Sequence, residues 1–199
     1  NMSLSDKEGN NIFAKADDEN GLSEEAYSFI AGLMEHMRAM TAITNPIVNS
    51  YKRLVPGYEA PTYIAWSATN RSPLIRVPAA RGLGTRVELR SPDCATNPYL
   101  AIAVCLAAGL DGIKNNLQPV ESIQRDIYSM TDEERDEAGI ENVPKNLYEA
   151  IQEMRKSDFV KGVLGKEVFK KYIKAKEEEW MEYTSQVTDW EIDRYLGRI

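Results

Sequence analysis

Residues 51–92 read YKRLVPGYEAPTYIAWSATNRSPLIRVPAARGLGTRVELRSP, and positive charge collects in this stretch. Its cations are Lys52, Arg53, Arg71, Arg76, Arg81, Arg86 and Arg90. Only Glu59 and Glu88 oppose them, which leaves a net +5, whereas the remaining residues carry 17 lysines and arginines and 29 carboxylates within an overall charge of −7. Arginine presents a planar fork of donors that suits carboxylate and phosphate oxygens. The stretch therefore predicts a binding site for a small polyanion.

Proline shapes the same region. Seven of the nine prolines lie between Asn45 and Pro98. Because proline lacks a backbone donor and restricts the residue before it, long helices are not expected here. The runs Thr62–Ser67, Leu74–Val77 and Thr85–Leu89 predict short strands. The connections between them are too short for helical crossovers, so we expect antiparallel pairing.

Residues 85–90, TRVELR, alternate between uncharged and charged side chains. Successive side chains of a strand point to opposite faces, so Arg86, Glu88 and Arg90 are expected to share one face while the uncharged residues face a core. A carboxylate between two guanidiniums has two interpretations. It is either a structural ion pair, or a ligand for a divalent metal beside arginines that hold an anionic substrate. The strand alone leaves both open.

A loop precedes these strands. Residues 55–61, VPGYEAP, place a proline near each end and Gly57 between them. The single carboxylate of this loop, Glu59, is either an ordinary exposed glutamate or the tip of a lid over the anion site.

Helices are expected on both sides of the proline-rich region. Ser23, followed by two glutamates, is expected to cap a helix that runs to about Thr41. His36, the only histidine, lies on this helix and is expected to be a hydrogen-bonded packing residue. Pro98 suits the first position of a second helix, which extends to about Leu117. This helix is apolar nearly all round, so we expect it to be central and buried.

These patterns predict a mixed α+β fold with short antiparallel strands followed by a mainly helical C-terminal half. Asn1–Leu4 and Asn11–Lys15 are expected to add two further short strands. On this interpretation residues 1–96 form a part rich in strands and loops with one helix, and residues 97–199 form a helical part.

Composition limits the protein class. No apolar run approaches the roughly 20 residues of a membrane span, and the polar N-terminus lacks the pattern of a signal peptide. Cys94 and Cys105 are too few for a disulfide framework and are expected to be reduced core thiols of a cytoplasmic protein. The acidic overall charge argues against general nucleic-acid binding, which requires a broad basic surface.

Several blocks of this sequence follow one another in a fixed order. They read NPIVNSYKRLVPGYEAP at 45–61, NRS at 70–72, IRVP at 75–78, RVELR at 86–90 and DCATNPY at 93–99. In order, and nearly in spacing, they resemble the glutamine synthetase family of bacterial type I. A block of 17 residues is far more specific than a short glycine motif. The resemblance covers essentially all 199 residues and implies the C-terminal part of the catalytic domain.

The resemblance implies an ATP-dependent ligase. Glutamate and ATP would form γ-glutamyl phosphate, from which ammonia displaces phosphate to give glutamine. It also implies two divalent cations, Mg²⁺ or Mn²⁺, and, for full-length members, assembly into two stacked hexameric rings with active sites between subunits.

The resemblance also implies roles for individual residues. Arg53 and Arg90 match arginines that hold the carboxylate groups of glutamate, and Glu88 matches a metal ligand. Glu59 matches the glutamate of a mobile flap that shields the intermediate and helps to accept ammonium. The residues matched to ATP and the transferring phosphoryl group are Ser3, Arg71, Arg76 and Arg86, of which Arg71 is also implied to be catalytic.

The sequence departs from the family pattern as well. The family's metal-binding histidine, its Glu-x-Glu metal strands and its N-terminal β-grasp domain have no counterpart in these 199 residues. We therefore expect a C-terminal fragment that is inactive as an isolated chain. Residues 126–130 match the segment around the family's modifiable tyrosine poorly, so adenylylation of Tyr128 is not expected. The alternative function is a stand-alone, non-catalytic module that binds an anionic metabolite or a protein.

Overall fold

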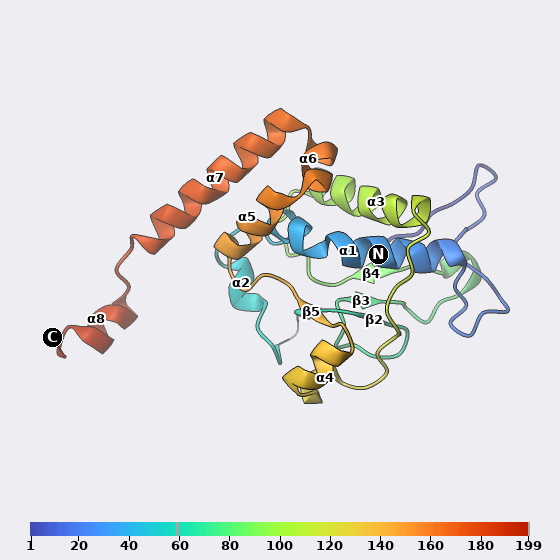
Figure 1. Ribbon diagram of the computed structural model, residues 1–199, viewed down its shortest axis with the longest axis horizontal. Coiled ribbons are helices and arrows are strands. Elements are labelled where there is room, and N and C mark those ends of the chain that lie inside the picture. The colour runs from blue at the N-terminus through green and yellow to red at the C-terminus, as the bar shows by residue number, and fades with distance from the viewer. Residues whose placement is uncertain (59, 199) are drawn as a thin grey trace.

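The computed structural model describes residues 1–58 and 60–198 of the chain (Figure 1). Its helices are α1 (Glu24–Thr44), α2 (Ser50–Arg53), α3 (Pro98–Lys114), α4 (Asp132–Glu137), α5 (Leu147–Lys156), α6 (Asp158–Leu164), α7 (Lys166–Thr184) and α8 (Asp189–Tyr195). The strands are β1 (Tyr63–Ile64), β2 (Trp66–Ser67), β3 (Ile75–Arg76), β4 (Glu88–Leu89) and β5 (Glu141–Asn142). Two 3₁₀ turns, η1 (Gly82–Gly84) and η2 (Ile127–Ser129), complete the elements. The predicted α+β class, with short strands before a mainly helical C-terminal half, is confirmed.

Two long helices of the core, α1 and α3, lie side by side (Figure 1). As predicted, Ser23 caps α1, because its hydroxyl accepts a hydrogen bond from the Ala26 backbone N–H at 3.1 Å. Glycines let the two backbones touch. A β-carbon at Gly32 would lie 2.1 Å from the carbonyl oxygen of Ala108, and one at Gly112 would lie 2.0 Å from that of Ser28. No side chain can enter such a space without moving a helix.

The main hydrophobic core forms around α1. Leu33, Met37 and Met40 are fully buried, and helices α3, α5 and α6 pack on this helix. His36 is the packing residue that the sequence predicts. Its Nε2 lies 2.8 Å from an Asp111 carboxylate oxygen on α3, and its ring stacks on Phe159 of α6 with centroids 3.7 Å apart.

The strands form two small sheets rather than one. β1 pairs antiparallel with β5, whereas β2, β3 and β4 form a three-stranded sheet. The predicted strand Thr62–Ser67 is therefore divided between the two sheets. The β3–β4 pairing is antiparallel, but β2 and β3 run parallel, which corrects the expected pairing. A parallel connection must return the chain to the starting end of the first strand. Because β2 and β3 are only two residues long, the loop between them covers this distance without a helix.

The N-terminal segment also differs from the prediction. Residues 1–15 form isolated bridges instead of strands: Met2 pairs with Val87, Ser5 with Asn11, and Ala14 with Leu22. The backbone turns at residues 6–10, where the Asp6 N–H donates to the Asn10 carbonyl oxygen and the Gly9 N–H to that of Asp6, and each pairing extends over a single bridge.

Helix α3 is less buried than its composition predicts. One face packs on α1, but a stripe on the other face is exposed at Tyr99 (83%), Ile102 (65%), Leu106 (41%) and Leu110 (46%). Cys105 is buried and burial raises its pKa to about 11, whereas Cys94 is exposed, so only one of the two free thiols belongs to the core. Among the helices that the structure describes, none combines the length and hydrophobicity needed to cross a bilayer.

Candidate active site

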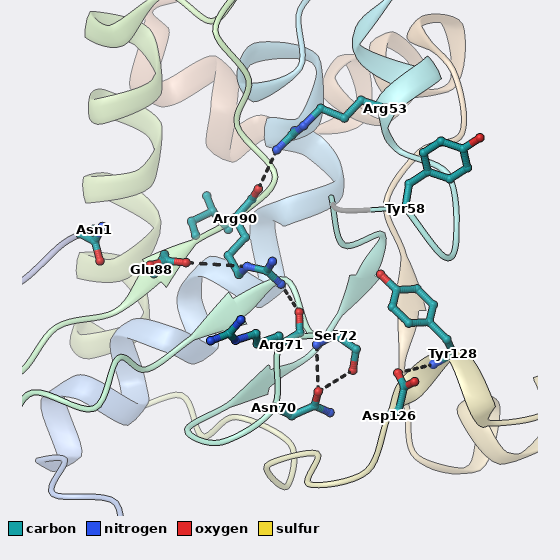
Figure 2. Close-up of a pocket in the computed structure, with 11 residues that line it drawn as sticks. Asn1, Arg53, Tyr58, Asn70, Arg71, Ser72, Glu88, Arg90, Asp126 and Tyr128 are labelled. Atoms are coloured by element: carbon teal, nitrogen blue, oxygen red, sulfur yellow. Dashed lines mark hydrogen bonds and ion pairs between the residues drawn. The ribbon is translucent and has the colours of Figure 1, made fainter.

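A pocket of about 790 Å³ opens where the three-stranded sheet meets the loops around it (Figure 2). Arginines gather around one carboxylate on one side of it, and the Tyr128 hydroxyl points toward them from another segment, whereas the exposed Tyr58 ring points away (Figure 2). The described residues that line the pocket are Asn1, Arg53, Tyr58, Asn70, Arg71, Ser72, Glu88, Leu89, Arg90, Asp126 and Tyr128.

The register of two strands places the carboxylate. Arg76 on β3 lies opposite Glu88 on β4, and its guanidinium donates two hydrogen bonds to that carboxylate, at 3.2 and 2.7 Å. Arg90 approaches the same carboxylate from the other side, with 3.7 Å between its Nε and Oε1. The hydrogen bonds from Arg76, together with the charge of both arginines, lower the pKa of Glu88. Glu88 is therefore ionised near neutral pH, and it partly offsets the positive charge of the pocket.

Arg90 lines the pocket between Glu88, Arg53 and Arg71 (Figure 2). Its guanidinium donates to the carbonyl oxygen of Arg71, and a second, longer bond of 3.4 Å reaches the carbonyl oxygen of Pro73. Partial burial lowers its pKa, but an arginine remains charged at any physiological pH. Arg90 thus joins the sheet to the loop that carries Arg71.

Arg53 reaches the pocket from the end of α2. Its Nη1 donates to the carbonyl oxygen of Ser91 at 2.8 Å, and the buried Asn45 side chain donates to the same oxygen at 2.8 Å. Asn45 and Arg53, which both belong to the block 45–61, therefore donate hydrogen bonds to the same carbonyl oxygen. This shared contact directs the Arg53 guanidinium toward Arg90 (Figure 2).

The structure brings together four of the predicted site residues, Arg53, Arg71, Glu88 and Arg90. Three others lie outside the lining. Arg76 stands behind Glu88, Arg86 donates to the Asn1 side chain and to the carbonyl oxygen of Gly84, and Ser3 is exposed. Glu59 lies outside the residues that the structure describes.

The pocket has too few carboxylate ligands for a complete metal site. A divalent magnesium or manganese ion takes about six oxygen ligands. Within residues 1–58 and 60–198, no three acidic, histidine or cysteine side chains come together as a cation site would require. Glu88 could give one ligand, so the described residues do not by themselves fit a bound cation.

Several lining residues have no role predicted from the sequence. Asn70 and Ser72 belong to the block 70–72, but the resemblance implies no role for them. Asp126 and Tyr128 reach the pocket from η2, some 40 residues after β4 in the chain. No local sequence pattern predicts that these residues reach the pocket, because their position depends on the path of the segment after α3.

Three comparisons place the chain among known proteins. Residues 1–195 match the family described as "Glutamine synthetase, catalytic domain". A glutamine synthetase from Clostridium saccharobutylicum is 57% identical over 198 residues, covering 100% of this chain and 44% of its own length. One from Methanosarcina mazei is 56% identical over 193 residues, covering 97% and 43%. The chain therefore spans less than half the length of these relatives.

Solved structures agree with this placement. A GmaS/ADP complex superposes with a TM-score of 0.86 at 38% identity, covering 98% of this chain and 44% of that one. GmaS without ligand superposes with a TM-score of 0.81 at the same identity, covering 96% and 42%.

Proposed function

Because the chain belongs to the glutamine synthetase catalytic-domain family, we propose that it takes part in the ATP-dependent joining of ammonia to glutamate. The observation that carries this proposal is the convergence of Arg53, Arg71 and Arg90 on one pocket that also contains Glu88. Its volume of about 790 Å³ falls in the range usual for sites of small molecules and cofactors.

The charges fit a transfer of a phosphoryl group between two anions. Such a reaction depends mainly on positioning and on cations that neutralise charge as it moves. In our proposal Arg53 and Arg90 hold the carboxylates of glutamate and Arg71 acts on the transferring phosphoryl group. Arg76, Arg86 and Ser3 serve ATP from the edge of the pocket, since they do not line it in this structure.

Two roles depend on parts beyond the described pocket. Glu59 would belong to a flap that keeps water from the acyl phosphate, which would otherwise hydrolyse. Glu88 would be one ligand of a Mg²⁺ or Mn²⁺ ion whose other ligands come from elsewhere. We accordingly propose that these 199 residues are the C-terminal segment of a catalytic domain that acts in the cytoplasm as a self-associating enzyme.

A complementation experiment tests this function. The 199-residue chain is assayed for glutamine formation alone and after co-expression with the region of the Clostridium saccharobutylicum relative that it does not match. We expect no turnover from the chain alone and measurable turnover from the pair. Glutamine made by the chain alone would contradict the expected inactivity, and a pair that binds ADP but never turns over would favour a non-catalytic anion-binding module.

A matched pair of variants tests the role of the pocket. Arg53→Gln removes a guanidinium from the lining, whereas Lys52→Gln removes an exposed charge one residue away. Loss of one electrostatic contact to the reacting groups typically lowers turnover by about 100-fold or more. We expect that loss from Arg53→Gln in the complemented pair and near-normal turnover from Lys52→Gln; equal effects would refute the assignment of the pocket.

A further inference from the structure

Two segments far apart in the sequence form facing parts of the pocket, and one asparagine contacts both. The loop 67–73 carries Arg71, and the segment 122–130 carries Tyr128 (Figure 2). Asn70 belongs to the first segment, but its side-chain amide donates to the carbonyl oxygens of Arg125 and Ile123 in the second. The amide group of Asn70 is therefore a direct polar connection between the two segments.

The other end of the Asn70 side chain shapes its own loop. Its Oδ1 accepts hydrogen bonds from the Ser72 backbone N–H at 2.9 Å and from the Ser72 hydroxyl at 3.0 Å. Because these bonds span residue 71, they close a tight turn with Arg71 at its apex. Only an amide supplies an acceptor and two donors at once, so neither aspartate nor leucine could replace it on both sides.

Ser72 extends this connection into the protein. Its hydroxyl donates to Asn70 and accepts from the Ile127 backbone N–H at 3.1 Å. Ser72 and Ile127 are both buried, and Ile127 packs in a small separate core with Tyr63 and Met130. A series of hydrogen bonds thus runs from the buried Ile127 through the buried Ser72 to the half-buried Asn70. Ile127 directly precedes Tyr128 in the sequence.

Arg71 and Tyr128 both line the pocket, and these hydrogen bonds connect the two segments that carry them. The carbonyl oxygen of Arg71 accepts from the guanidinium of Arg90, so the turn that Asn70 closes also decides where Arg90 is held. On the other side, the Tyr128 ring meets the Tyr63 ring edge-on at 5.7 Å. A shift of the turn would move two arginines relative to the tyrosine.

We propose that Asn70 is a positioning residue, which through Ser72 fixes the distance between the arginine side and the Tyr128 side of the pocket. The proposal rests on the proposed function in one respect, namely that the pocket binds a phosphate-bearing ligand. The positioning itself follows from the hydrogen bonds and can be tested without any ligand.

The structural half of the test uses amide hydrogen exchange. In the full 199-residue protein, Asn70→Ala and Ser72→Ala should each speed hydrogen exchange of the Ile127 amide by about tenfold. Each variant removes at least one of the hydrogen bonds that connect Ile127, Ser72 and Asn70. Ser72→Thr retains the hydroxyl and should restore protection. Gln124→Ala is the matched control, because Gln124 accepts from the Thr69 hydroxyl between the same two segments but does not line the pocket.

The binding half uses inorganic tripolyphosphate as the probe, with calorimetric detection. Loss of one positioning hydrogen bond corresponds to about tenfold weaker binding, which we expect for Asn70→Ala and Ser72→Ala but not for Ser72→Thr or Gln124→Ala. Normal binding and normal Ile127 protection in Asn70→Ala would overturn the proposal. Weakened binding with normal protection would also overturn it, because Asn70 would then be a direct ligand.

The two halves separate this proposal from the function. If the wild-type chain binds no tripolyphosphate, the phosphate assignment fails while the exchange data still decide the positioning. Should Asn70→Ala not fold, the Ser72→Ala and Ser72→Thr pair provides both measurements.

Discussion

The contact between α1 and α3 and the lining of the pocket fix their distances by opposite means. Between the helices, Gly32 and Gly112 carry no side chain, and backbone meets backbone. In and just behind the pocket lining, Arg53, Arg90 and Arg76 hold carbonyl and carboxylate oxygens with the ends of long side chains. The helix contact therefore fails when an atom is added, whereas the pocket fails when a functional group is removed.

The largest expected effect breaks the helix side of this comparison. In Gly112→Ala the new methyl group would lie 2.0 Å from the carbonyl oxygen of Ser28, so α1 and α3 must separate. We expect a loss of about 3 kcal/mol in the free energy of unfolding, at the upper end of the range for overpacking. Chemical denaturation followed by circular dichroism measures it.

Gly162→Ala is the control for that change. Gly162 also lies in a helix, α6, but a β-carbon there has open space around it. Alanine should stabilise the protein there by up to about 1 kcal/mol through its helix propensity. If both alanines had the same sign, close packing would not be the reason for the glycine at 112.

A smaller effect is expected at the start of α1. Ser23 accepts from the Ala26 N–H and donates to the Ile12 carbonyl oxygen at 2.6 Å. Ser23→Ala should cost about 1–2 kcal/mol, the upper range for a helix cap, while Ser23→Thr keeps the hydroxyl and should cost less. Thermal unfolding compares the two, and equal losses would mean that the hydroxyl group does not contribute.

The smallest expected effect on stability concerns the ion pair between Glu88 and Arg76 at the pocket, and it depends on pH. The hydrogen bonds from Arg76 lower the pKa of Glu88 in the folded protein below its ordinary value of 4.5. The ionised carboxylate therefore stabilises the fold above pH 4.5, and this contribution is lost as the pH falls through the lower folded pKa. For a partly exposed pair we expect about 0.5–1 kcal/mol.

Glu88→Gln removes this contribution. The stability difference between wild type and variant should be constant near neutral pH and shrink in acid, as urea titrations at several pH values would show. Glu167→Gln, which alters an exposed pair with Lys171 on α7, is the control and should change little at any pH. A difference that grew in acid would contradict the assigned pairing of Glu88.

Local chemistry explains which features the sequence predicts. Ser23 caps α1 because capping needs only neighbouring residues, and Thr85 and Val87 are buried because strand alternation is local. The division of residues 62–67 between two sheets is not local, since it depends on β5 arriving nearly 80 residues later. The exposed stripe of α3 was missed for the same reason, because composition does not say which faces find a neighbour.

The site residues also differ in whether local sequence or tertiary structure determines their position. Arg53, Arg71, Glu88 and Arg90 were predicted from blocks of sequence and lie together. The separation of Arg76 and Arg86 from the lining was not predicted, because each turns toward a partner that local sequence does not specify: Arg76 on β3 pairs with Glu88, and Arg86 donates to Asn1. The sequence predicts no role for Tyr128 in the pocket; it lines the pocket because of the tertiary course of residues 122–130.

The segregation of charge has a consequence for how a ligand arrives. Outside residues 51–92 the chain carries an excess of 12 negative charges, so approaching anions meet repulsion over most of the molecule. Near the three arginines of the pocket the sign of the charge reverses, and the field guides a diffusing anion toward this pocket. Dissolved salt screens this guidance over about 10 Å at 0.1 M, so the encounter rate with a polyphosphate should fall as ionic strength rises.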